Sequence, residues 1–327
     1  MQGLKSWVSA NAYMLMLLGT VILATVLPVS GLAAQVVSKI SLGAVALLFF
    51  LYGAKLKSEV IVAGMTNWRL QAMVLVTTFV VFPLLGFGLV AVFGQWLPPE
   101  LALGMLYLSI LPSTVQSSIA LTAMARGNVP AAICAASLSN ILGVIVTPLL
   151  AAWLLSTKGV PFDAMSIVWI CVQLLLPFAL GQALRPWIGA RIEKAKRLTT
   201  FVDRGSILLI VYSAFSAGVV GGIWSRVEPA SLVLIIALDL AMLFIVIGFV
   251  SFAGRKAGLS RADRISLLFC GSQKSLASGV PMANVLFAGP SAGLIILPLM
   301  LYHQFQLFVS AAIAQRMSRE PEAVPAE

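Results

Sequence analysis

Charged residues are scarce in this sequence, and their scarcity excludes a water-soluble domain. Only 10% of the 327 residues are Asp, Glu, Lys or Arg, whereas 60% are apolar, which is more than a water-facing surface can carry. A membrane-crossing helix needs roughly 20 residues, so the composition allows on the order of ten crossings. The basic residues lie between apolar runs and not on one exposed face, so the net charge of +10 does not indicate nucleic-acid binding.

Cysteine and histidine are also scarce. The three cysteines, at positions 134, 171 and 270, lie in apolar runs and share no metal-ligand spacing. Neither a disulfide framework nor a zinc site is therefore predicted, and we expect no organic cofactor. Acidic residues inside the apolar runs do not come in pairs, which argues against an enzyme. The nucleophile-elbow pattern at 289–293 needs a strand–turn–helix context that a helical chain lacks.

Long apolar runs predict an all-α integral membrane protein with ten transmembrane helices, because runs of this length can satisfy their backbone in lipid only as helices. The ten runs divide five and five between residues 155 and 165. We therefore predict two repeats, 1–155 and 156–315, before a disordered cytoplasmic tail at 316–327. Five is odd, so the repeats are inverted, as is typical of secondary transporters. The ten runs are 12–29, 34–54, 70–93, 101–126, 130–155, 165–184, 202–222, 231–253, 262–287 and 291–315.

The basic residues predict the orientation of the chain. If both termini share one side, the connections on that side carry seventeen Lys and Arg residues, whereas the opposite side carries only Lys158 and Arg226. The positive-inside rule then places both termini in the cytoplasm, with the chain in the lipid bilayer of a bacterial inner membrane. A cleaved signal peptide over residues 1–34 is the rival interpretation, and it would leave nine spans.

Two predicted spans are interrupted, and both are fourth in their half. Proline in Leu111–Thr114 removes a backbone donor, and glycine with polar residues weakens the helix at Cys270–Gln273. Segments 116–120 and 273–277 also resemble each other, with three identities. Broken helices present backbone groups and half-helix N-termini that bind ions or anionic substrates; a kinked helix repaired by serine hydroxyls is the alternative. The candidate binding residues here are Ser113, Thr114, Ser117, Ser118, Gln273, Lys274 and Ser275.

Four polar residues lie deep inside predicted spans. Lys274 is about 12 residues from either end of its span, roughly 18 Å at the helical rise, and therefore needs a local partner. Asp239 is the natural partner, in a structural pair; alternatively the ammonium holds a substrate anion or replaces a sodium ion's charge. His303 either relays protons or is a satisfied core histidine. Asn140 either ligates an ion or bonds between helices.

The segments 118–128 and 271–281 resemble the bile acid:sodium symporter family, and 271–281 is most similar to the branch of its seventh vertebrate member. The resemblance implies a panel of spans 1, 2, 6 and 7 and a core of spans 3 to 5 and 8 to 10. In that family the broken fourth and ninth spans cross, and sodium binds beside the crossing. By resemblance, Ser118 and Gln273 are the sodium-site residues.

Two positions depart from the family pattern. Ile119 replaces a usual asparagine, and Phe269 replaces the glutamate that ligates both sodium ions in bile acid carriers. These departures argue against the usual coupling to two sodium ions. The sequence predicts a secondary active transporter that moves a small organic anion by rocking core against panel, with Na⁺ as a candidate coupling ion. The alternative is a regulatory or scaffold protein that keeps this fold without transport.

Overall fold

The computed structural model describes residues 12–55, 67–157, 164–222, 227–287 and 289–319. The expected periplasmic charges Lys158 and Arg226, and most of the acidic tail, lie outside the described residues. Within the described ranges all regular structure is helical. Six helices in those ranges are long and apolar enough to cross a membrane. These findings confirm the predicted all-helical, multi-pass membrane class.

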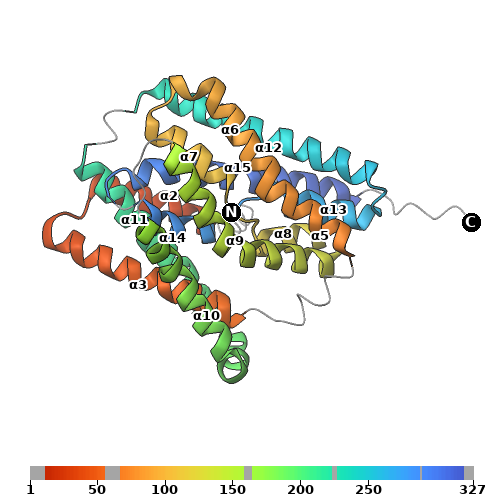
Figure 1. Cartoon of the computed structure of the whole chain (residues 1–327), viewed down its shortest axis with the longest axis horizontal. Helices are drawn as coiled ribbons and strands as arrows, with labels where there is room; N and C mark the ends of the chain where they lie inside the picture. Colours follow the sequence, from red (N-terminus) through yellow and green to blue (C-terminus); the bar gives the residue numbers. More distant parts are fainter. Residues whose placement is uncertain (1–11, 56–66, 158–163, 223–226, 288, 320–327) are drawn as a thin grey trace, which may run out of the picture.

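Figure 1 shows how the described helices are arranged. Two short elements interrupt the α-helices, a π-helix (η2) and a 3₁₀ turn (η3). In chain order the elements are α2 (Ala12–Val26), α3 (Gly31–Lys55), α5 (Trp68–Val76), η2 (Thr77–Val81), α6 (Phe82–Phe93), η3 (Gly94–Trp96), α7 (Pro99–Ser109), α8 (Gln116–Met124), α9 (Val129–Thr157), α10 (Ala164–Lys194), α11 (Lys196–Val220), α12 (Pro229–Lys256), α13 (Arg261–Ser272), α14 (Leu276–Leu286) and α15 (Ala292–Arg319).

Helices α2, α3, α10 and α11 form one group, which we name the panel. Helix α3 packs along α10, and α11 contacts both α2 and α3; α3 and α10 lie side by side at the lower left of Figure 1. A Cβ atom at Gly53 would lie 2.0 Å from the Phe178 carbonyl oxygen, and one at Gly181 would lie 2.0 Å from that of Phe50. Glycine therefore lets the two backbones touch, as small residues do between membrane helices.

The remaining helices, α5 to α9 and α12 to α15, form a second group, which we name the core. Within it α15 packs on α7 and α12, and α13 packs on α12 and α8. The outer surface of the molecule carries large exposed apolar side chains such as Leu84, Trp187 and Phe252. Such extensive apolar exposure suits contact with lipid.

The core contains both predicted interruptions. Helix α7 ends at Ser109 and α8 begins at Gln116, while α13 ends at Ser272 and α14 begins at Leu276. The sequence predicted these two breaks but not the π-helix η2, which ends two residues before Pro83. Such π-helical turns are often found at functional sites.

Candidate ion and substrate site

The two unwound segments of the core contact each other. The Ser275 N–H donates to the Pro112 carbonyl oxygen over 2.9 Å, and the Ser113 hydroxyl donates to the Cys270 carbonyl oxygen over 2.5 Å. Each break therefore provides hydrogen-bond partners for backbone groups at the other break. Lipid tails could not provide such partners. The predicted contact between the two broken helices is present.

Gln273 gathers three hydroxyl groups from the first break. Its Oε1 atom accepts from Thr114 over 2.5 Å, from Ser117 over 2.7 Å and from Ser118 over 3.0 Å. Ser118 also lies 3.1 Å from the Phe269 carbonyl oxygen. We name these four side chains and that carbonyl the oxygen cluster. Hydroxyl and carbonyl oxygens suit hard cations, so the cluster is able to ligate one, although it contains no carboxylate.

Asn140 bridges the two breaks. Its Nδ2 atom donates to the Ser113 carbonyl oxygen over 2.6 Å and to that of Ala136 over 3.0 Å. Its Oδ1 atom accepts from the Ser278 hydroxyl over 2.8 Å. Ser278 in turn donates its N–H to Ser275, the N-cap of α14. These contacts make Asn140 an interhelical hydrogen-bonding residue, one of the two alternatives predicted.

Lys274 does find the local partners that its depth requires, but they are not acidic. Its Nζ donates to the carbonyl oxygens of Thr78 over 2.9 Å, Ser109 over 2.7 Å and Leu111 over 2.7 Å. It also lies 4.1 Å from the centroid of the Phe82 ring. The side chain is fully buried. Lys274 therefore joins the second break to the end of α7 and to η2.

The predicted ion pair between Lys274 and Asp239 is wrong. Lys55 pairs with Asp203 at 3.1 Å, whereas Lys274 has no carboxylate partner among the described residues. Asp239 is buried in α12, and neither of its carboxylate oxygens bonds to a described residue. The prediction failed because it considered only acidic side chains as partners, whereas a broken helix also frees carbonyl oxygens.

His303 and Gln306 support the unwound peptide of Lys274. The Lys274 N–H donates to Gln306 Oε1 over 2.7 Å, and Gln306 Nε2 donates back to the Lys274 carbonyl oxygen over 2.9 Å. Gln306 Nε2 also lies 2.8 Å from His303 Nδ1. Gln306 thus replaces the backbone hydrogen bonds that the Lys274 peptide groups would make in a continuous helix, and His303 orients Gln306. This geometry favours the satisfied histidine over the proton relay.

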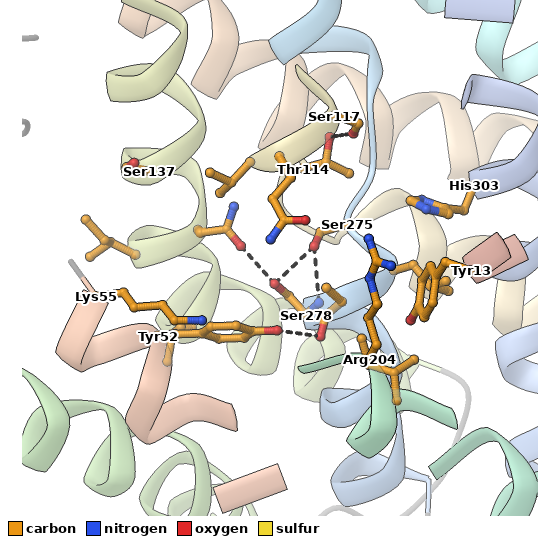
Figure 2. Close-up of a pocket in the computed structure, with 18 of the residues that line it drawn as sticks. Tyr13, Tyr52, Lys55, Thr114, Ser117, Ser137, Arg204, Ser275, Ser278 and His303 are labelled. Atoms are coloured by element: carbon orange, nitrogen blue, oxygen red, sulfur yellow. Dashed lines mark hydrogen bonds between the residues drawn. The ribbon is translucent and has the colours of Figure 1, made fainter. Parts of the chain in front are cut away.

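A pocket of about 410 Å³ lies between panel and core (Figure 2). Neither Lys274 nor Asp239 lines it. Across it the Tyr52 hydroxyl of α3 donates to the Ala277 carbonyl oxygen of α14 over 3.1 Å. Predicted site residues that do line the pocket are Thr114, Ser117, Asn140, Ser275 and His303; the panel contributes Tyr13, Tyr52, Lys55, Phe178, Arg204 and Ile207.

Both sides of the pocket carry groups that attract an anion. On the panel side, Arg204 lies over the Tyr13 ring at 5.1 Å from its centroid, and Lys55, which is paired with Asp203, is also a lining residue. Figure 2 shows the Arg204 side chain beside Tyr13. On the core side, the first turns of α8 and α14 line the pocket, and helix N-termini carry partial positive charge. This arrangement can hold an anion.

Lys55 and Arg204 were not predicted as pocket residues, because in the sequence both fit the pattern of cytoplasmic basic residues. Arg204 had one distinguishing signal, since it lies inside the apolar run 202–222. A basic residue inside a span faces protein or a cavity more often than lipid.

Three known proteins show what the chain is similar to. The pattern of the SBF-like CPA transporter family matches residues 11–319. "Uncharacterized protein PA2026" of Pseudomonas aeruginosa is 50% identical over 308 residues, covering 94% of this chain and 92% of that protein. "Putative symporter YfeH" of Escherichia coli (strain K12) is 44% identical over 321 residues, covering 97% and 96%. "Sodium/bile acid cotransporter 7" of Rattus norvegicus is 30% identical over 279 residues, covering 83% and 80%.

Proposed function

This chain belongs to the SBF-like CPA transporter family, among the relatives of the bile acid:sodium symporters, and we propose that it is a secondary active transporter of a small organic anion. The names of two relatives describe a symporter and a cotransporter. The observation that carries the proposal is the pocket between panel and core, since both of its walls favour negative charge.

The lining of the pocket supports an anion with an apolar body. Arg204 can bind a carboxylate or a similar group, whereas the Lys55 ammonium is already paired with Asp203. The N-termini of α8 and α14 face the anion from the core. Apolar side chains such as Phe178 and Ile207 complete the lining. The volume of about 410 Å³ falls inside the range of roughly 300–1,000 Å³ that holds small-molecule ligands.

The proposed transport cycle rocks the core against the panel. The hydrogen bond between Tyr52 and Ala277 joins the two groups across the pocket. A single hydrogen bond of this kind is worth about 0.5–1.5 kcal/mol, so breaking it is a small barrier to opening. The two breaks, in contrast, are joined to each other by many bonds and would move together.

The order of the described helices supports an inverted repeat with ten crossings. If α5–α6, α7–α8 and α13–α14 each count as one interrupted crossing, the described chain supplies five before residue 157 and five after residue 164. Because five is odd, the two halves would run in opposite directions. The cytoplasmic placement of both termini in a bacterial inner membrane rests on the distribution of basic residues.

Sodium is the proposed coupling ion, at the oxygen cluster around Gln273. Cotransporter 7 carries sodium in its name, and the cluster brings together side-chain oxygens from both breaks. Without a carboxylate its affinity should be low, because uncharged oxygens neutralise none of the ion's charge.

Uptake into proteoliposomes tests the proposed transport. Purified protein is reconstituted, and vesicles are offered labelled monocarboxylates, sulfonates and organic phosphates, with amines of similar size as the opposite-charge control. We expect saturable uptake of at least one anion, no uptake in protein-free vesicles and none of the amines. An anion that binds but is never taken up would favour the scaffold alternative, and preferential uptake of amines would contradict the proposed substrate class.

A further inference from the structure

The contacts of the Lys274 side chain match those that an ammonium ion needs. An ammonium group has three N–H donors, and Nζ has three carbonyl acceptors, on Thr78, Ser109 and Leu111, at 2.7–2.9 Å. A neutral amine has only two N–H bonds, so its lone pair would face one carbonyl oxygen. The Phe82 ring lies on the remaining side, with its centroid 4.1 Å from Nζ, and the face of an aromatic ring attracts a cation.

These carbonyl oxygens form a cation site. Ser109 and Leu111 lie at the C-terminal end of the half-helix α7, and Thr78 lies in the π-helix η2. The C-terminus of a helix carries partial negative charge. In transporters with discontinuous helices, half-helix C-termini and unwound carbonyls are the groups that hold Na⁺. The ammonium of Lys274 therefore occupies a place suited to an alkali-metal ion.

The charge of Lys274 is not available for another purpose. Within the described residues no carboxylate lies within 4.0 Å of its Nζ atom. The side chain is fully buried and does not line the pocket between panel and core. It therefore neither anchors a substrate nor forms an ion pair, and its contacts lie entirely inside the core.

We propose that Lys274 is a built-in cation, which permanently fills the carbonyl site at the end of α7 and makes the packing of the two breaks independent of a dissolved ion at that site. A tethered cation cannot leave with the substrate. Any sodium coupling is then confined to the oxygen cluster around Gln273. This last consequence rests on the proposed transport function, whereas the cation site itself does not.

Cation rescue of melting temperature tests the proposal on the full-length protein in detergent. Lys274→Ala removes the ammonium and leaves space for an ion, whereas Lys274→Met removes the charge but fills the space. Each protein is melted in chloride salts of sodium, potassium, ammonium and methylammonium, with choline chloride at equal ionic strength as reference. Lys39→Ala, at an exposed lysine of α3, is the matched control.

We expect Lys274→Ala to melt roughly 5–10 °C below the wild type in choline and to regain most of that loss in at least one small cation. The gain should exceed the wild-type shift in the same salt. Lys274→Met should also melt lower but should not recover, and Lys39→Ala should behave as the wild type. A Lys274→Met protein as stable as the wild type would overturn the proposal, as would a Lys274→Ala protein that no cation rescues.

A second measurement keeps Lys274 in place, in case Lys274→Ala does not fold. Fluorination of the Phe82 ring weakens its attraction for a cation with little change of shape. Phe49 is the control, because it is also buried and packs edge-on against a tyrosine, Tyr52, as Phe82 packs against Tyr302. We expect trifluorophenylalanine to lower the melting temperature more at position 82 than at position 49; equal shifts would count against the built-in cation. Neither measurement needs a substrate, so both can succeed where the transport proposal fails.

Discussion

The backbone N–H of Ser275 donates to the carbonyl oxygen of Pro112 over 2.9 Å, so a main-chain hydrogen bond joins the two broken helices. Both residues lie in unwound segments, where backbone groups have lost their helical partners. The hydrogen bond makes the two breaks one unit, which forms the core wall of the pocket. Changes that separate the breaks should therefore destabilise the protein and alter ligand binding together.

Gly143→Ala should push the first break away from α9. A Cβ atom at Gly143 would lie 2.6 Å from Cβ of Pro112, whose ring cannot rotate away. We expect a loss of about 1–3 kcal/mol of stability, as for other overpacked sites, measured as a lower melting temperature. Gly88→Ala is the control, because a Cβ atom there meets nothing within 4 Å. Equal melting temperatures for the two variants would show that the close contact between Gly143 and Pro112 does not limit the size of the residue at position 143.

Asn140→Ala should weaken the bridge between the breaks. The change leaves the Ser113 carbonyl and the Ser278 hydroxyl without this partner, at a cost of about 1–3 kcal/mol for unsatisfied buried groups. Thermal unfolding in detergent measures the loss. Ser137→Ala, on the same wall of the pocket, should have a smaller effect. If the serine variant were the less stable, Asn140 would not be the bridging residue.

The sequence predicts the breaks well, because proline at position 112 and glycine at position 271 act through local backbone chemistry. It does not predict the partners of Lys274, since the carbonyl oxygens of Ser109 and Leu111 become available only because α7 ends at Ser109, and that of Thr78 lies in the π-helix η2. The pocket role of Arg204 is missed for a related reason. Its direction depends on how α11 packs against α2, whereas the pattern of charges along the chain reveals only its side of the membrane.

Cysteine labelling should reveal the orientation of the chain. Single cysteines are introduced as Lys158→Cys, Arg226→Cys and Arg191→Cys in a background without native cysteines. An impermeant maleimide should label the first two in intact cells, and Arg191→Cys only after permeabilisation, because basic residues stay on the cytoplasmic side. Labelling of Arg191→Cys from outside would contradict the ten-crossing topology.

Sodium, if it stabilises the protein, should do so through one weak site. The rise in melting temperature between choline chloride and sodium chloride should fit a single site, and Gln273→Leu should abolish it by removing the oxygen shared by three hydroxyls. Gln71→Leu, at another buried glutamine, in α5, should keep the response. Two tight sodium sites would mean that Lys274 does not fill a cation site.

Calorimetric binding of an organic anion to wild-type, Arg204→Gln and Arg197→Gln protein tests the central claim most directly. The anion is the one that raises the melting temperature most in a screen of carboxylates, sulfonates and phosphates. Arg204 lines the pocket between panel and core, whereas Arg197 lies on the same helix outside it. A charge-assisted hydrogen bond is worth about 1.5–3 kcal/mol, so Arg204→Gln should weaken binding by about 10-fold to 100-fold, while Arg197→Gln should bind as the wild type does. Unchanged affinity in a folded Arg204→Gln protein, or equal losses in both variants, would contradict an anion site between panel and core.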